Sequence, residues 1–310
     1  MSLSLTGTAS AQADYPGRQP VKLVVPFGAG SGVDQLARHV AEGLQRELGG
    51  NFVVDNRPGA SGMIAASAVA RAAPDGYTLL MASSSTHSSI GALVKNVSYD
   101  VERDFQPIAN FIDADFFLVV RGDSEVKSVK DLVARIKAQP GKTAYGFGSV
   151  TTQVAGATFA KQAGLDSAAT AYKSNPSALT DLLGGTIDWM FIDQTIGLQQ
   201  IASGKIRPLA VAAQDRRSDL KDVPTTYESG YPFTITAWIG LMTPAGIPDE
   251  VRRKLSQATA NLLRNEDMRA RFVRSGRVAA PMSTEAYAAY LKQQRESWES
   301  KIRDAGIKPE

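Results

Sequence analysis

The chain of 310 residues contains no cysteine, and this absence excludes disulfides, thiolate metal ligands and a cysteine nucleophile. It has only two histidines, His39 and His87, which lie far apart in the sequence, so a zinc site would need carboxylates that no motif supplies. No apolar run approaches the roughly 18 residues that a membrane span needs. The 34 basic and 31 acidic residues are dispersed, without the basic block that is typical of a nucleic-acid-binding arm.

Catalytic motifs are also missing. The segment Gly59–Met63 resembles a G-x-S-x-G nucleophile elbow but has methionine at its last position, and no G-x-x-x-x-G-K-[ST] phosphate loop is present. We therefore predict no enzymatic activity, no catalytic residue, no metal and no cofactor. With 43% hydrophobic and 21% charged residues, the composition is that of a globular protein, and the length suffices for two domains.

The first residues indicate export. Met1–Ala13 is a stretch of small residues that ends in Ala-Gln-Ala before a polar Asp14, as at a secretory cleavage site. The basic start and long apolar core of a complete signal peptide are missing. We interpret residues 1–13 as a signal-peptide remnant, with a disordered tail as the alternative, and we predict a periplasmic protein.

Short apolar strands alternate with helical periods along most of the chain. The strand Lys22–Pro26 precedes a glycine-rich loop and a helix whose apolar residues, from Val33 to Leu48, share one face. A second series of strands and helices begins near Phe116–Val120 and ends at Arg207–Ala212. This alternation predicts an α/β fold with two lobes, each built on a mainly parallel sheet flanked by helices.

The end of the chain carries two long amphipathic helices, Pro248–Leu263 and Ser283–Ala305. If both pack back on the first lobe, that lobe is discontinuous. We predict lobe 1 at residues 14–114 plus 233–310 and lobe 2 at residues 115–232, with crossings near 113–115 and 229–234.

The loop after the first strand, Phe27–Gly32, is a candidate anion site. It opens a helix, and the free N–H groups of a helix start favour phosphate or carboxylate. Gly28 and Gly30 match the dinucleotide fingerprint G-x-G-x-x-G, but Val33 stands at its third glycine, while Asp55 could imitate the acid that holds a ribose. Nucleotide binding and a purely structural turn therefore remain alternatives.

Three further strand-end loops are rich in hydroxyl groups or carry an acid. In the loop 83–89, the residues Ser84, Ser85, Thr86 and His87 could surround a carboxylate with donors, or form a solvated helix cap. His87 is the titratable group there that could add charge to an anion. The other two loops contain Ser149, Thr151, Thr152 and Asp193. Asp193 could accept a hydrogen bond from a ligand or cap the next helix.

These segments resemble the Bug-type receptors of tripartite tricarboxylate transporters, a family of extracytoplasmic solute-binding proteins. The resemblance covers about Tyr15 to Glu310 and rests on several motifs in order: Val24-Val25-Pro26-Phe27-x-Ala29-Gly30, Asn56-Arg57-Pro58-Gly59-Ala60-x-Gly62, Pro74-Asp75-Gly76-Tyr77-Thr78-Leu79, Ala178-Leu179-Thr180-Asp181-Leu182-Leu183-Gly184-Gly185 and Pro244-Ala245-Gly246-Ile247-Pro248. It implies a type II-like periplasmic binding protein, with the ligand in a cleft between the lobes.

The resemblance also implies site residues and partners. Carried over by position, the ligand contacts are Phe27, Gly28, Ala29, Ser84, Ser85, Thr86, His87, Ser149, Thr151, Thr152 and Asp193. This sequence departs from the family pattern at Ser31, at the loop Ser149–Thr152 and at Ile90-Gly91, all on ligand-facing segments. We expect a monomer that delivers a small carboxylate to membrane permease subunits, with a dicarboxylate such as terephthalate or an aliphatic diacid favoured. The alternative is a two-domain, dinucleotide-dependent oxidoreductase.

Overall fold

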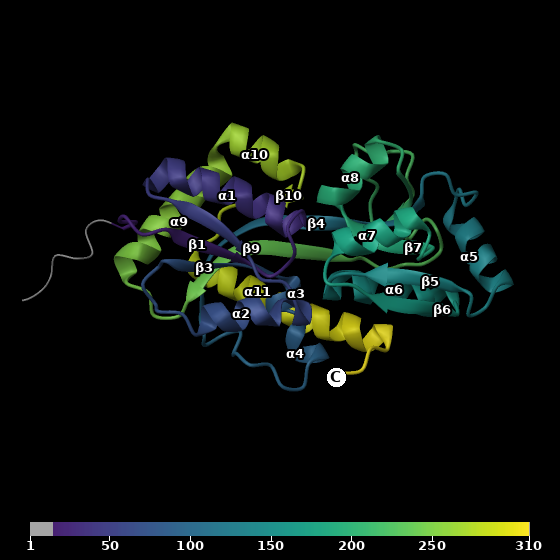
Figure 1. Ribbon diagram of the computed structural model, residues 1–310, viewed down its shortest axis with the longest axis horizontal. Coiled ribbons are helices and arrows are strands. Elements are labelled where there is room, and N and C mark those ends of the chain that lie inside the picture. The colour runs from purple at the N-terminus through teal and green to yellow at the C-terminus, as the bar shows by residue number, and fades with distance from the viewer. Residues whose placement is uncertain (1–14, 310) are drawn as a thin grey trace, which may run out of the picture.

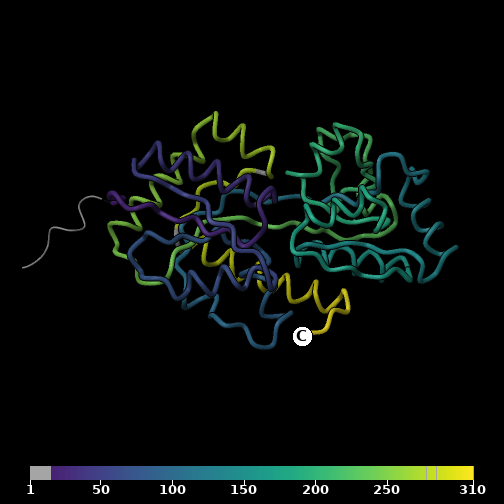
Figure 2. The backbone as a smooth tube through the Cα atoms, in the orientation of Figure 1, coloured from purple at the N-terminus to yellow at the C-terminus, as the bar shows by residue number. Residues whose placement is uncertain are grey.

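The computed structural model describes residues 15–309, so the predicted signal remnant lies outside the described part of the chain. Two β-sheets lie end to end, and the strand order along them is β2-β1-β3-β9-β4-β7-β5-β6 (Figures 1 and 2). The first sheet contains β1 (Val21–Val25), β2 (Phe52–Asn56), β3 (Thr78–Ser83), β9 (Thr236–Pro244), β10 (Arg277–Val278) and the first part of β4 (Phe105–Arg121). The second contains the rest of β4 with β5 (Thr143–Phe147), β6 (Ser167–Ala171), β7 (Trp189–Asp193) and β8 (Ile206–Val211).

The long strand β4 belongs to both sheets. Its residues 105–115 pair with β9 in the first sheet, whereas its residues from Phe116 to Val120 pair with β7 in the second. Because β4 is antiparallel to β9, β7 and β8, and β3 is antiparallel to β9, both sheets are mixed. The prediction of mainly parallel sheets was therefore wrong in this respect, although the α/β fold itself is confirmed. The residue boundaries that we predicted for the two lobes remain a prediction.

Helices cover both faces of each sheet (Figure 1). On the first sheet, one face is covered by α1 (Gly32–Leu48), α9 (Asp249–Arg264) and α10 (Glu266–Val273), and the other by η1 (Ala60–Gly62), α2 (Met63–Ala70), α3 (Ser84–His87), α4 (Ile90–Leu93) and α11 (Thr284–Ala305). On the second sheet, α5 (Val129–Ala138) and α6 (Val150–Ala163) cover one face, and α7 (Asn175–Gly184) and α8 (Gln194–Ala202) the other. The predicted apolar face of α1 is confirmed, since Leu36, Val40 and Leu44 are completely buried.

The last helix, α11, joins the two halves of the molecule. It begins beneath the first sheet, and its C-terminal end reaches α6, where Lys161 Nζ donates to the carbonyl oxygen of Asp304 over 2.7 Å (Figure 1). Trp298 and Ile302 of α11 are buried in the same apolar core as Phe159 of α6. None of the helices described in residues 15–309 combines the length and the apolar character that crossing a membrane requires.

Candidate functional site

A network of hydrogen bonds fixes the loop before α1. Ser31 caps the helix by accepting from the N–H of Asp34 over 3.2 Å, and the Asp34 carboxylate accepts from the N–H of Gly30 over 2.8 Å. Asn56, at the end of β2, donates both to Asp34 and to the carbonyl oxygen of Phe27. Burial alone would raise the pKa of Asp34, but the hydrogen bonds from Gly30, Arg38 and Asn56 outweigh burial and lower the pKa below its ordinary value, so the carboxylate stays ionised. The start of α1 is thus held in one conformation.

The start of α6 is built in a similar way in the second sheet. Ser149 caps this helix, and the hydroxyl of Thr152 accepts from the N–H groups of Gly148 and Ser149 over 3.2 Å each. Asn175 accepts from the N–H of Gly148 over 3.1 Å, which ties the start of α7 to the same loop. A side chain at position 148 would lie 2.0 Å from the backbone of Ser174, so this approach requires glycine.

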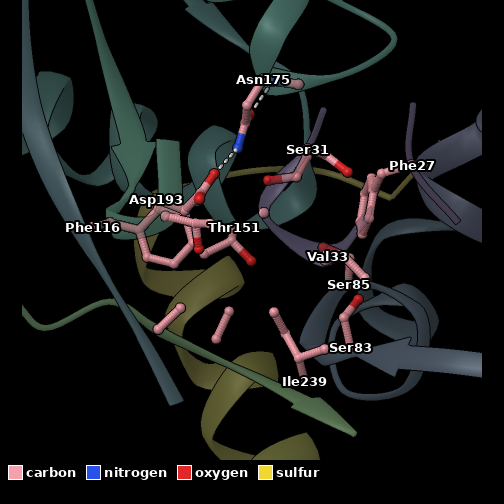
Figure 3. A pocket seen from close by; sticks show the side chains of 16 residues that line it. Phe27, Ser31, Val33, Ser83, Ser85, Phe116, Thr151, Asn175, Asp193 and Ile239 are labelled. Carbon is pink, nitrogen blue, oxygen red and sulfur yellow. Dashed lines mark hydrogen bonds between the residues drawn. The ribbon is translucent and has the colours of Figure 1, made fainter. Parts of the chain in front are cut away.

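A cavity lies between the two sheets, where the starts of α1, α3 and α6 meet. Its volume is about 50 Å³, which holds a few water molecules or one small functional group. Figure 3 shows Phe116, Thr151 and Asp193 on one side of it and Phe27, Ser31 and Ser85 on the other. The lining residues are Phe27, Ser31, Gly32, Val33, Ser83, Ser85, Ala114, Phe116, Gly148, Ser149, Thr151, Asn175, Asp193, Thr195, Ala237 and Ile239. We call this space the inner chamber.

A second, larger hollow of about 320 Å³ adjoins the first and shares Phe27, Gly148 and Ser149 with it. The remaining lining residues of this outer chamber are Pro26, Gly59, Ala60, Ser61, Gly62, Phe147, Gln153, Ala171, Tyr172 and Lys173. Ala60 and Ser61 both have positive φ angles, 46° and 56°, a backbone conformation that residues other than glycine rarely adopt. Lys173 is the one cationic side chain among the described residues that line either chamber.

Asp193 is the only ionisable side chain among the described residues of the inner chamber. Its Oδ2 accepts from Asn175 Nδ2 over 3.2 Å and its Oδ1 from the N–H of Ile196 over 3.3 Å. Burial raises the pKa of this carboxyl, and the bonds from Asn175 and Ile196 offset part of that effect. Within residues 15–309 no cluster of potential metal ligands occurs.

The two halves of the molecule approach each other closely at Gly32. A Cβ atom at this position would lie 2.5 Å from Oδ1 of Asp193 and 3.0 Å from Oγ1 of Thr195, both in the second half. Asp193 therefore faces the N-terminal end of α1, where the helix dipole favours an anion. The predicted cap role of Asp193 is present, since its carboxylate accepts from Ile196 at the start of α8.

The structure brings five of the eleven predicted contact residues together in the inner chamber: Phe27, Ser85, Ser149, Thr151 and Asp193. The other six, Gly28, Ala29, Ser84, Thr86, His87 and Thr152, line neither chamber. For these six the ligand contact stays a prediction.

Local structure explains why these residues lie elsewhere. Gly28 faces Ser174 across the cleft, and Ala29 is exposed. Ser84 Oγ accepts from the N–H of Trp238 over 3.0 Å, while Thr86 accepts from the N–H of Ser83. Thr152 is occupied by its capping role. The hydroxyl groups of Ser84, Thr86 and Thr152 thus take part in hydrogen bonds that hold the loops in place.

His87 is the clearest correction. Its ring packs among Phe105, Tyr99 and Trp238, with centroid distances of 4.6, 6.2 and 6.2 Å, and its Nδ1 is 2.9 Å from Thr86 Oγ1. Burial, with a smaller effect of Arg295, lowers the pKa of His87 to about 3. The side chain is therefore neutral at physiological pH, and the expectation that it adds charge to a bound anion was wrong.

Phe116, Asn175 and Thr195 line the chamber but were missed in the sequence. Ser31 and Ser83 belong to loops that were predicted as candidate sites, although neither was among the predicted contact residues. Asn175 stands at a strand-to-helix junction, and this position alone could have identified it. Phe116 and Thr195 carried no such signal, because they reach the chamber only through the path of β4 and the docking of α8.

A cleft between two α/β halves, walled by hydroxyl groups and helix starts, is the site of a solute-binding protein. The family profile described as "Tripartite tricarboxylate transporter family receptor" matches residues 36–307. The chain belongs to this receptor family. Members are binding proteins and not enzymes, which removes the oxidoreductase alternative.

Solved structures agree with this assignment. One from R. palustris, described as bound to adipate, is 30% identical, covers 96% of this chain and 100% of its own, and superposes with a TM-score of 0.91. The periplasmic binding protein BugD is 33% identical over 94% of this chain and 99% of its own, with a TM-score of 0.88. MatC from Rhodopseudomonas palustris, described with bound malate, is 28% identical over 91% and 98%, with a TM-score of 0.84.

Proposed function

We propose that this protein is an exported, periplasmic and monomeric receptor that captures a small dicarboxylate between two lobes and delivers it to the permease subunits of a tripartite transporter. The lobes we propose are residues 14–114 plus 233–310 and residues 115–232. The observation that carries the proposal is the convergence of α1 and α6, from different sheets, on one chamber with Ser31, Ser149 and Thr151 in its wall. Backbone N–H groups and hydroxyls of this kind bind a carboxylate without a cationic side chain.

The two chambers support a ligand with two acidic ends. The inner chamber has room for one carboxylate-sized group, and the outer chamber continues from it past Phe27 and Ser149. Lys173 in the outer wall has the charge to attract a second carboxylate. Phe27 and Phe116 add aromatic surface, so an aromatic diacid such as terephthalate is a candidate beside aliphatic ones. The adipate and malate bound by the related proteins are both diacids.

A thermal-shift screen tests the proposal. Mono- and dicarboxylates are compared with NAD-type nucleotides, each at saturating concentration. A ligand at 100 times its Kd stabilises the folded state by roughly 2.7 kcal/mol, so we expect a clear rise in melting temperature with at least one dicarboxylate. The matching monocarboxylates should give smaller rises. Stabilisation by nucleotides but by no acid would contradict the proposal.

A further inference from the structure

The side chain of Asp193 places a carboxylate of the protein inside the chamber that we propose binds a carboxylate of the ligand. The presence of this protein carboxylate restricts which ligands can bind there. Asp193 is about 8% exposed and lines the inner chamber, where the other described lining residues carry no charge. Two ionised carboxylates in one desolvated space repel each other, and neither would find a cation there. Because burial already raises the pKa of Asp193, a bare carboxylate binds either against this repulsion or with the uptake of a proton. A ligand that presents only a carboxylate to this chamber therefore pays an electrostatic penalty.

The neighbouring cation does not remove this penalty. Arg217 contacts Gln194, the residue after Asp193, with its Nη1 2.8 Å from Gln194 Oε1. Its guanidinium is already engaged by Asp115 over 2.7 Å and by Asp219 over 2.9 Å. The cation is thus balanced by two carboxylates of its own, outside the inner chamber.

Asp193 can still accept a further hydrogen bond. An ionised carboxylate offers about four lone-pair positions. Asn175 donates to Oδ2 and the Ile196 N–H donates to Oδ1. The Thr195 hydroxyl also adjoins this carboxylate, but it donates its proton to the carbonyl oxygen of Ser275 over 3.3 Å. A donor on the ligand would complete this set, and it would be attracted by the charge that repels a bare carboxylate.

We propose that Asp193 selects carboxylates that carry a hydrogen-bond donor, a hydroxyl or ammonium group, on the carbon next to the acid. In such a ligand the carboxylate binds at the starts of α1 and α6, and the adjacent donor points to Asp193. The inference rests on the proposed function and narrows the ligand from dicarboxylates in general to 2-hydroxy and 2-amino acids.

Isothermal titration calorimetry of matched pairs tests this selection. The probes are succinate with malate, glutarate with 2-hydroxyglutarate, and propionate with lactate, so that each pair differs by one hydroxyl. A hydrogen bond to a charged group is worth about 1.5–3 kcal/mol, so we expect the wild type to bind the hydroxylated member about 10-fold or more tightly. This ratio needs no variant. Equal affinities within each pair would overturn the inference.

Asp193→Asn supplies the second test. The amide keeps the shape of the side chain and can still accept from the Ile196 N–H, but it lacks the charge. We expect the preference for the hydroxylated acid to fall to about 2-fold or less. The acid without the hydroxyl should bind the variant at least as tightly as it binds the wild type, because the charge that repels it is gone. The control is Asp131→Asn, which removes an exposed carboxylate at the start of α5 that lines neither chamber. A preference that survives in Asp193→Asn would overturn the inference, whereas failure of every probe to bind the wild type would contradict the proposed function itself.

Discussion

The same residue type serves different purposes depending on how deeply it is buried, and His87 illustrates this. Its position in a hydroxyl-rich loop suggests a ligand contact, but the loop turns into a short helix that directs the ring into the aromatic cluster of Tyr99, Phe105 and Trp238. Desolvation then keeps the imidazole neutral, because a buried cation without a partner is costly. The loop composition could be predicted, but the direction of this side chain could not.

Because the pKa of His87 falls from 6.5 to about 3 on folding, the histidine makes stability depend on pH. As the pH falls below about 6.5, His87 becomes protonated in the unfolded chain but stays neutral in the folded chain. The free energy of unfolding therefore decreases as the pH falls from 6.5 toward 3. We expect this one group to cost about 2 kcal/mol at pH 5 relative to pH 7. In urea unfolding, His87→Asn should therefore lose less stability between these pH values than the wild type.

An equal loss in the variant and the wild type would contradict this assignment. The variant also tests the correction made above. Since His87 lines neither chamber, His87→Asn should leave the ratio of dicarboxylate to monocarboxylate affinity unchanged.

At the scale of elements, the start of α1 determines how closely the two halves approach. Gly32 is its first residue and faces Asp193 and Thr195 across the cleft. The φ angle of Gly32 is not in the left-handed region, so alanine is acceptable to the backbone. Glycine is needed at this position because it leaves room for the side chains of Asp193 and Thr195, and not because of its backbone conformation.

Gly32→Ala should therefore weaken ligand binding without unfolding the protein. Its Cβ would lie 2.5 Å from Asp193 Oδ1, and such overpacking costs roughly 1–3 kcal/mol. If ligand binding requires the closed cleft, affinity for a carboxylate found in the screen should fall about 10-fold or more in calorimetry. The matched control is Gly91→Ala in α4, where the added methyl group meets open space. Wild-type affinity in Gly32→Ala would contradict this role.

Prediction of the elements succeeded where local signals were regular. The helix after the glycine-rich loop was predicted from the apolar period that starts at Val33, and it begins where Ser31 caps it by accepting the N–H of Asp34. The first part of β4, residues 105–115, was not predicted as a strand. Pro107 interrupts it, and its register with β9 shifts twice, so the alternation of a regular strand is lost. This bulged segment is also the one that carries the chain from one sheet to the other.

At the scale of the whole molecule, the two halves are joined by a shared apolar core, by two elements that pass between them and by hydrogen bonds. One apolar core extends through both sheets, and β4 and α11 pass from one half to the other. Gln194 and Thr195 at the start of α8 donate to the carbonyl oxygens of Val273 and Ser275 over 3.2 and 3.3 Å. Opening of the cleft would have to break or stretch these two bonds, so they stabilise the closed arrangement in the same direction as a bound ligand does.

The sequence was informative about which loops meet at the cleft but not about which atoms face it. Loops at strand ends converge by topology, so Phe27, Ser149 and Asp193 could be grouped without a structure. Residues such as Phe116 and Ile239 enter through the crossing strands, whose side-chain direction depends on register. The location of the cleft can therefore be predicted from the sequence, whereas the residues that line it can be predicted only in part.

The most direct test of the central claim is a crystal structure of the protein grown with the carboxylate that stabilises it most. We predict density for the ligand in the inner chamber, with one carboxylate within hydrogen-bond distance of Ser31, Ser149 or Thr151 and the rest of the molecule extending toward Lys173. A ligand bound elsewhere on the surface, with both chambers occupied only by water, would contradict the account.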